Sequence, residues 1–321
     1  MKPTVLGYWT DWNAAYPPEK VPWRSLTHVC HAFSTVAEDG SLNPIRNEAP
    51  IARLVSLGRK AKVPVLLSLG GGSNSETMSK TITTPEKVTA LADAVGERVK
   101  KLGYSGVDMD WEGIGSKEEQ VNLEALVAEI RKRLPRSLLL TQAVGAGIWG
   151  NQHVDSKKML PHIDFLNLMT YDFSGPWGQA AGHNAPLSFC ESSIAFWNGK
   201  QGWPKSRLNL GIPIYGRGFR AGTLGGKTTG NYARSYVDLK EVEKLTQAGW
   251  TPKTDPKDQV PYLVHPEGSE LISYEDAVSA RIKGEWAKKQ GLGGVFFWEL
   301  SGDRTENKES VLQAARTGLL K

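Results

Sequence analysis

One segment of the chain reads Gly103-Tyr-Ser-Gly-Val-Asp-Met-Asp-Trp-Glu112. If this segment is a β-strand, its side chains alternate, so Asp108, Asp110 and Glu112 share one face and the apolar residues between them share the other. The apolar face would pack against covering helices, which leaves three stacked carboxylates on an inner face. Ionised carboxylates resist desolvation and repel each other, so this arrangement is costly. A solvated acidic edge strand is the structural alternative, but the flanking apolar residues and the strand's central place favour a functional site.

Neighbouring carboxylates also change one another's pKa. Like charges push the pKa values of a cluster apart, so we expect Glu112, the outermost acid, to be protonated near neutral pH. It could then serve as a general acid. We expect Asp110 and Asp108, which lie deeper in the barrel than Glu112, to share a proton. Such a cluster is suited to protonating a leaving group.

The rest of the chain alternates short apolar runs with amphipathic stretches. Eight runs predict strands, and helical patterns lie between most of them. Eight β-α units close into a barrel whose active site lies at the C-terminal ends of the strands, where the acidic segment would place its acids. The predicted strands are Val5–Trp9, Leu26–Phe33, Val63–Leu69, Gly106–Glu112, Leu138–Val144, Phe165–Tyr171, Leu208–Ile214 and Gly294–Trp298. The predicted helices are Pro50–Lys60, Pro85–Lys101, Lys117–Leu134, Ala277–Gln290 and Glu309–Leu320.

The predicted fold class is therefore α/β, a (β/α)8 TIM barrel with one insertion between strand seven and strand eight. That connection is rich in Gly, Thr and Lys and then in Pro and Asp, and it holds short strand-like pieces. We predict a small α+β insertion domain over 219–274. The barrel domain would comprise 1–218 and 275–321, close to the roughly 250 residues typical of the fold.

The composition excludes several classes of protein. Apolar residues make up 40% and charged residues 23%, which is ordinary for a globular chain and excludes a disordered one. The net charge is only +5, from 39 Lys and Arg against 34 Asp and Glu, and these are scattered, so a basic face for nucleic acid is not expected. No run reaches the roughly 18 apolar residues of a membrane span. The outlier is tryptophan, at 11 residues, whose flat rings suit sugar binding in a cleft.

Cysteine and histidine give little sign of a metal site. Two cysteines, Cys30 and Cys190, exclude a disulfide framework and a four-cysteine zinc site. Two buried thiols are the simpler interpretation, and a single bridge between them stays open. No two of the six histidines pair with a carboxylate at metal-ligand spacing, so we predict no metal and no cofactor.

The acidic segment resembles the strand-four signature of family 18 glycoside hydrolases, the chitinases, which is Asp-Gly-x-Asp-x-Asp-x-Glu. Its last three acids match Asp108, Asp110 and Glu112, and Ser105 stands where the signature begins with Asp. Four more segments resemble motifs of the family in the same order, so the resemblance extends from Gly7 to Asp303. They are Leu67-Ser-Leu-Gly-Gly71, Leu168-Met-Thr-Tyr-Asp-Phe-Ser-Gly-Pro-Trp177, Leu210-Gly-Ile-Pro-Ile-Tyr-Gly-Arg-Gly-Phe219 and Gly293-Gly-Val-Phe-Phe-Trp-Glu-Leu-Ser-Gly-Asp303.

The chain also departs from the family pattern. The family often has Trp after its Ser-x-Gly-Gly pair, where this chain has Gly72, and Tyr-Pro after the catalytic Glu, where it has Gly113 and Ile114. We expect these departures to alter the cleft and to leave the acid in place. The resemblance further implies cis peptide bonds at Ala32-Phe33 and Trp298-Glu299.

The resemblance implies a retaining, substrate-assisted mechanism, in which the substrate's 2-acetamido oxygen attacks the anomeric carbon and forms an oxazolinium. Glu112 would protonate the glycosidic oxygen and then act as base for water. Asp110 would orient the acetamido N–H, and Tyr171 would hydrogen-bond the acetamido oxygen. Asp108, the third acid of the catalytic group, would be supported by Tyr8.

The resemblance also implies a set of substrate-binding residues. Trp298 would form the floor under the −1 sugar, while Trp12 and Trp177 would be minus-side and plus-side platforms. We expect Trp9, Trp111 and Trp286 to be structural. The other residues expected to line the −1 subsite are Met169, Asp172, Tyr215 and Arg217.

The implied function is hydrolysis of the β-1,4 linkages of chitin and chitooligosaccharides. We expect a monomer that binds neither nucleic acid nor a membrane. The N-terminus has no apolar run long enough for a signal peptide, so either the protein is not exported by that route or the signal peptide is absent from this chain. We expect secretion, and a cytoplasmic location or another route of export stays open. One alternative is a carbohydrate-binding protein on the same barrel that has lost activity, although Glu112, Asp110 and Tyr171 are present. Another is an enzyme acting on peptidoglycan or on the chitobiose core of N-glycans.

Overall fold

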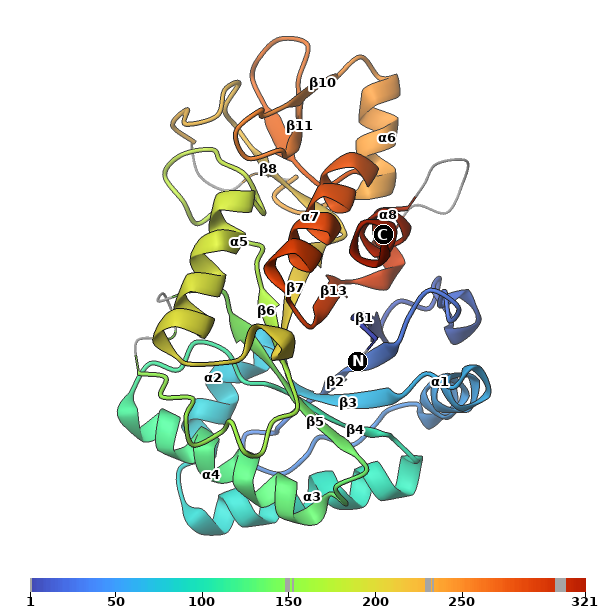
Figure 1. The fold of residues 1–321 in the computed structure, drawn as a ribbon, viewed down its shortest axis with the longest axis vertical. Helices are drawn as coiled ribbons and strands as arrows, with labels where there is room; N and C mark the ends of the chain where they lie inside the picture. The colour runs from blue at the N-terminus through green and yellow to red at the C-terminus, as the bar shows by residue number, and fades with distance from the viewer. Residues whose placement is uncertain (1, 148–150, 152, 229–231, 233, 304–309) are drawn as a thin grey trace.

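The computed structural model describes residues 2–147, 151, 153–228, 232, 234–303 and 310–321. At its centre is a closed barrel of eight parallel strands, in the order β1-β13-β7-β6-β5-β4-β3-β2 (Figure 1). The predicted (β/α)8 barrel is therefore confirmed. The strands are β1 Thr4–Thr10, β2 His28–Ser34, β3 Val65–Gly70, β4 Gly106–Asp110, β5 Leu139–Gly145, β6 Leu166–Met169, β7 Leu208–Pro213 and β13 Gly294–Trp298.

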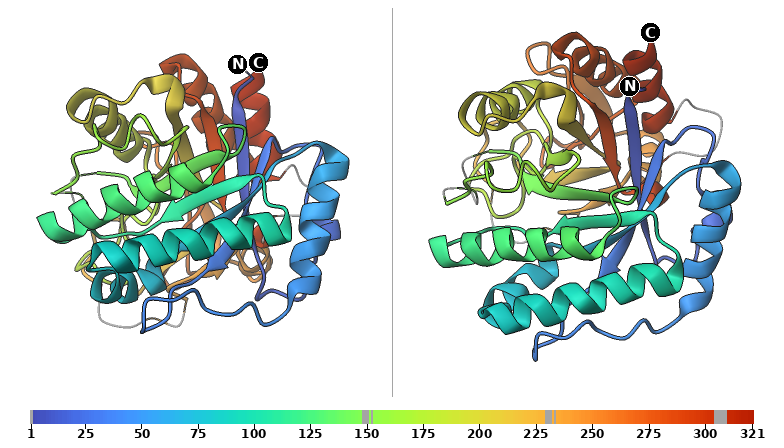
Figure 2. Two further views of the ribbon diagram at one scale, coloured as in Figure 1. Left: turned by 90° about the horizontal axis from the view of Figure 1, so that it is seen from below. Right: turned by 60° about the horizontal axis from the view of Figure 1, so that its bottom comes forward.

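Helices cover the outside of the barrel. In Figure 2 the teal and green helices α3 and α4 lie side by side on the outer surface. Both begin at side-chain caps: the Thr84 hydroxyl accepts from Lys87 N–H before α3, and the Ser116 hydroxyl accepts from Glu119 N–H before α4. The covering helices are α1 Glu48–Ala61, α2 Gly72–Thr81, α3 Pro85–Leu102, α4 Lys117–Arg133, α5 Leu187–Ile194, α7 Ala277–Gln290 and α8 Val311–Leu320.

The alternation predicted for β4 separates two layers of packing. Val107 and Met109 are fully buried in the large outer cluster, together with Leu91 of α3 and Leu123 of α4. The barrel interior has its own small apolar cluster, formed by residues of other strands such as Leu66. Because successive side chains of a strand point to opposite faces, this packing turns the acids of β4 inward.

Several element boundaries differ from the predictions in a way that bears on the site. Strand β4 ends at Asp110 and β6 at Met169, so Glu112 and Tyr171 lie just beyond the strand ends. Helix α2 was not expected, because its sequence is polar and has no apolar periodicity. The predicted helix Glu309–Leu320 is α8, and Glu309 itself lies outside the described residues.

A second sheet follows β7 in the chain and precedes α7, and it lies at the upper end of the molecule in Figure 1. Its strand order is β10-β11-β12-β8-β9, with antiparallel pairing throughout. Strand β8 starts at Tyr215 and thus crosses the predicted boundary at 218/219, and the division into domains stays a prediction. The strands and helix here are β8 Tyr215–Phe219, β9 Val237–Asp238, α6 Leu239–Gln247, β10 Thr251–Thr254, β11 Pro261–Val264 and β12 Leu271–Ser273.

Several smaller expectations are also borne out. Cys30 and Cys190 are free and buried, so no bridge joins them. The peptide bonds Ala32-Phe33 and Trp298-Glu299 are both cis. Trp9 and Trp111 are buried structural residues, and Trp286 packs partly buried against the core. Within the described ranges, the helices are too short or too polar for any one of them to span a membrane.

Candidate active site

Asp108 is fully buried inside the barrel and accepts four hydrogen bonds. Its Oδ2 accepts from the Tyr8 hydroxyl at 2.7 Å and from Ser68 Oγ at 3.0 Å. Its Oδ1 accepts from Thr141 Oγ1 at 2.6 Å and from Asn167 Nδ2 at 3.2 Å. Burial raises the pKa of Asp108, and these donors oppose the rise because they stabilise the charged form. The contact expected from Tyr8 is present.

The other three partners of Asp108 were not among the predicted site residues. Ser68, Asp108 and Thr141 are paired in register across β3, β4 and β5, so they lie in one layer of the barrel. Asn167 comes from β6, the next strand along. A sequence signal exists, since each is a polar residue inside a predicted buried strand, but only the register reveals that they meet.

Asp110 is 4% exposed, and its Oδ1 is buried with no hydrogen-bond partner. Burial raises its pKa well above the usual value for an aspartate, and the charges of Glu112 and Asp108 raise it further. Burying a carboxyl oxygen that has no hydrogen-bond partner lowers the stability of the folded protein. Such destabilising groups are typical of functional sites. The proton expected to be shared with Asp108 stays a prediction.

Glu112 lies in the loop after β4 and faces the cleft. Burial raises its pKa to about 7, the charge of Asp172 raises it too, and the backbone amide of Gly72 lowers it. The sequence pointed to repulsion within the acidic segment, whereas burial has the larger effect here. Glu112 can therefore hold a proton near neutral pH and release it within the same range.

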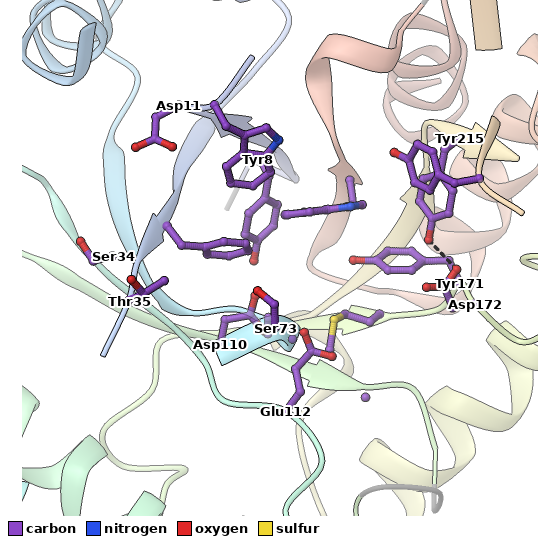
Figure 3. A pocket seen from close by; sticks show the side chains of 18 of the residues that line it. Tyr8, Asp11, Ser34, Thr35, Ser73, Asp110, Glu112, Tyr171, Asp172 and Tyr215 are labelled. Carbon is purple, nitrogen blue, oxygen red and sulfur yellow. Dashed lines mark hydrogen bonds between the residues drawn. The ribbon is translucent and has the colours of Figure 1, made fainter. Parts of the chain in front are cut away.

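Tyr171 and Asp172 follow β6 and lie across the pocket from Asp110 and Glu112 (Figure 3). The Tyr171 ring packs edge-on against Tyr215, with ring centroids 6.1 Å apart. Asp172 has a left-handed backbone with φ of 59°, and its N–H donates to Asn184 Oδ1 at 2.8 Å. This turn aims the Asp172 carboxylate at its partners on β8.

Arg217 and Tyr215 of β8 hold Asp172 in place. Arg217 binds the carboxylate through two nitrogens, Nε to Oδ1 at 2.8 Å and Nη2 to Oδ2 at 2.7 Å, and the Tyr215 hydroxyl donates to Oδ1 at 2.7 Å. The guanidinium also lies 5.1 Å from the ring of Trp177 and 5.5 Å from that of Tyr236. A bidentate pair flanked by aromatic rings fixes the geometry of this wall of the cleft.

These residues surround a cleft of about 1560 Å³. Eleven of the twelve predicted site residues line it, Met169 included, and Asp108 lies behind it. Trp298 stacks on Phe33 with centroids 5.5 Å apart and packs edge-on against Tyr8. Trp12 and Trp177 are 60% and 61% exposed, so their rings are open to a ligand.

Some cleft residues were missed by the sequence reasoning. Phe33 lines the cleft, Tyr236 enters it from the predicted insertion, and Asn184 positions Asp172 from behind. Asn184 lies in a segment, Gly182-His-Asn-Ala-Pro-Leu187, that follows the strand-six motif, so position alone could have suggested it. Among the residues that the structure places, no group of three or more His, Cys, Asp or Glu could hold a metal ion.

Comparisons with known proteins agree with this geometry. The family model described as "Glycosyl hydrolases family 18" matches residues 4–303. Chitinase A1 from Niallia circulans is 30% identical over 315 residues, which cover 83% of this chain and 45% of that protein. The chain therefore spans less than half the length of this relative.

Solved structures with the same fold include a chitinase and a chitinase-like agglutinin. A class V chitinase from Nicotiana tobaccum superimposes with a TM-score of 0.88 at 24% identity, covering 99% of both chains. A chitinase-like agglutinin from Robinia pseudoacacia has a TM-score of 0.86 at 22% identity, covering 98% of this chain and 99% of the other. At such identities the likeness shows a shared fold and leaves the chemistry to the residues of the site.

Proposed function

This chain belongs to glycosyl hydrolase family 18, and from that premise we propose that it cleaves the β-1,4 linkages between N-acetylglucosamine units of chitin and chitooligosaccharides. One observation carries the proposal: Glu112, with its pKa raised to about 7, faces a cleft that is lined with aromatic rings. A protonated acid in such a cleft can donate to the oxygen of a glycosidic bond.

In the proposed reaction the proton of Glu112 passes to the glycosidic oxygen while the bond to the anomeric carbon breaks. The carbonyl oxygen of the substrate's 2-acetamido group forms the new bond, giving an oxazolinium. Asp110 orients the acetamido N–H and stabilises the positive charge, and Tyr171 donates to the acetamido oxygen. Water then attacks the anomeric carbon and gives its proton to Glu112, so the configuration is retained.

The buried carboxylates suit this scheme. Asp110 has a buried oxygen without a hydrogen-bond partner, which destabilises the folded protein. A substrate N–H can donate to this oxygen, so a ligand that carries such a group is favoured over one that does not. Asp108 would act from behind, as a fixed charge held by four donors. With the acetamido oxygen as nucleophile, no second carboxylate is needed for direct attack.

The walls of the cleft fit a polymer of sugars. We place Trp298 under the −1 sugar, Met169, Asp172, Tyr215 and Arg217 around it, and Trp12 and Trp177 as platforms on either side. Support comes from the open rings of Trp12 and Trp177, because an exposed indole face in a cleft gains apolar burial when a ligand with an apolar face covers it. Chitin is a polymer found outside cells, and this supports secretion of the protein.

The domain division and the oligomeric state belong to the same proposal. The separate antiparallel sheet supports an insertion domain over 219–274 beside a barrel of 1–218 and 275–321. Several of the large exposed hydrophobic side chains line the cleft, which supports a monomer, since they are explained by substrate. They are Trp12, Phe173, Trp177 and Tyr236.

Three classes of glycan distinguish this proposal from its alternatives. We expect the protein to cleave N-acetylglucosamine hexamer and to leave muropeptides and N-glycosylated proteins intact. Cleavage of muropeptides or of N-glycosylated proteins would contradict chitin as the substrate. Binding of the hexamer without cleavage would favour the carbohydrate-binding alternative.

The activity is expected to fall as pH rises through about 7. The general acid must carry its proton, and the pKa of Glu112 is raised in the folded protein, so the active form predominates below that value and is lost above it. The measurement is kcat/KM on the hexamer across the neutral range, which reports groups of the free enzyme. A basic limb near the usual pKa of a glutamate would contradict the assignment of the acid.

A further inference from the structure

Helix α2 and its N-cap residue Gly71 are joined at three points to the end of β4 and to the loop that follows it. Gly71 N–H donates to the Asp110 carbonyl oxygen at 2.8 Å, and Glu112 N–H donates to Ser75 Oγ at 2.8 Å. Trp111 Nε1 donates to Ser79 Oγ at 3.1 Å. The three helix positions are spaced four residues apart, so they lie one above the other and follow the acid-bearing segment.

The contact of Ser75 with Glu112 is itself held in place. Ser75 is buried, and its hydroxyl donates to the Gly71 carbonyl oxygen at 3.2 Å. This leaves the oxygen lone pairs of Ser75 for the Glu112 N–H. The hydroxyl of Ser75 therefore holds the backbone of Glu112 in place.

Gly72, the first residue of α2, lies against the carboxyl of Glu112. A Cβ atom at this position would come within 2.9 Å of Glu112 Oε1, closer than such atoms pack. The backbone of Gly72 does not need a left-handed conformation, so an added Cβ would act by displacing the flexible end of the Glu112 side chain. In this chain the carboxyl of Glu112 therefore lies close to the point where a side chain at position 72 would begin.

This inference rests on the proposed function, in which Glu112 is the general acid. We propose that Gly72 and Ser75 are positioning residues for that acid: Ser75 fixes its backbone, and Gly72 leaves the room in which its carboxyl faces the glycosidic oxygen. A displacement of about 1 Å in a reacting group costs on the order of 100-fold in rate. Both residues act through Glu112 and not directly on the substrate.

The test compares Gly72→Ala and Ser75→Ala with wild type on the hexamer. We expect kcat to fall roughly 30-fold in Gly72→Ala and roughly 10-fold in Ser75→Ala, with KM within about twofold of wild type in both. Ser75→Thr keeps the hydroxyl and should recover most of the lost kcat. Gly199→Ala is the matched control, because Gly199 is exposed, does not line the cleft and has nothing within 4 Å of an added Cβ.

The outcomes separate this inference from the proposed function. If Glu112→Gln is inactive while Gly72→Ala and Ser75→Ala keep wild-type kcat, the positioning role is wrong and the assignment of the acid stands. If Glu112→Gln retains activity, the proposed function itself is wrong. Equal losses in Ser75→Ala and Ser75→Thr, or a matching loss in Gly199→Ala, would also overturn the positioning role. Thermal melting of each variant checks that it is folded.

Discussion

Glu112→Gln is expected to lower kcat on N-acetylglucosamine hexamer by about 10³- to 10⁴-fold. The amide keeps the shape of the side chain but has no proton to donate at any useful pH. The Glu112 carboxyl, whose pKa is raised to about 7 by burial and by the charge of Asp172, is the group best suited to that transfer. Binding of the hexamer, measured by calorimetry with the inactive variant, should stay within about threefold of wild type, because the aromatic walls are untouched.

The control for this variant is Glu97→Gln. Glu97 is exposed on α3 and is not among the residues that line the cleft, and the change removes the same charge. It should leave kcat unchanged. A Glu112→Gln protein that cleaved the hexamer at near wild-type rate would show that another group supplies the proton.

Asp110→Asn should lower kcat by roughly 100- to 1000-fold. The change removes the negative charge that Asp110 can carry beside the position where the oxazolinium would carry its positive charge, and it replaces one acceptor oxygen by a donor. Because the amide is nearly the same size, the barrel should fold as before, and steady-state kinetics with thermal melting can separate the two effects.

For this variant the matched control is Asp93→Asn, at an exposed carboxylate on α3 that pairs with Arg133. An exposed ion pair contributes little to stability, so both activity and melting should change little. If Asp110→Asn were as active as Asp93→Asn, the charge of Asp110 would have no part in the reaction.

Much of the barrel was predictable because local patterns agree with the global fold. The alternation over Val107 and Met109 matches their burial in the outer layer, and the helix predicted over Lys117–Leu134 is α4, which ends one residue earlier. Strand ends were less predictable: β4 stops at Asp110, two residues before the predicted end. The boundary depends on hydrogen bonding to β3 and β5, which a single strand's composition does not encode.

Site residues that stand in a recognisable sequence motif were predicted. Site residues that matter only because the fold brings them into contact were missed. Asp110, Glu112 and Tyr171 stand in strong local patterns. Ser68 and Thr141 became visible only once the barrel register set them beside Asp108.

Helix α2 was missed for a related reason. It has a polar sequence, and its contacts are made to the acid-bearing loop. The contacts of α2 with that loop therefore cannot be predicted from the sequence of the helix alone.

The most direct test of the account samples the hexamer digest early and reads the anomeric configuration of the first products. The proposed mechanism forms the oxazolinium on one face of the sugar and admits water from the other, so two displacements restore the original configuration. We predict β-anomers before mutarotation sets in. Early α-anomers would mean a single displacement by water and would contradict the roles given to Asp110, Tyr171 and the substrate's acetamido group.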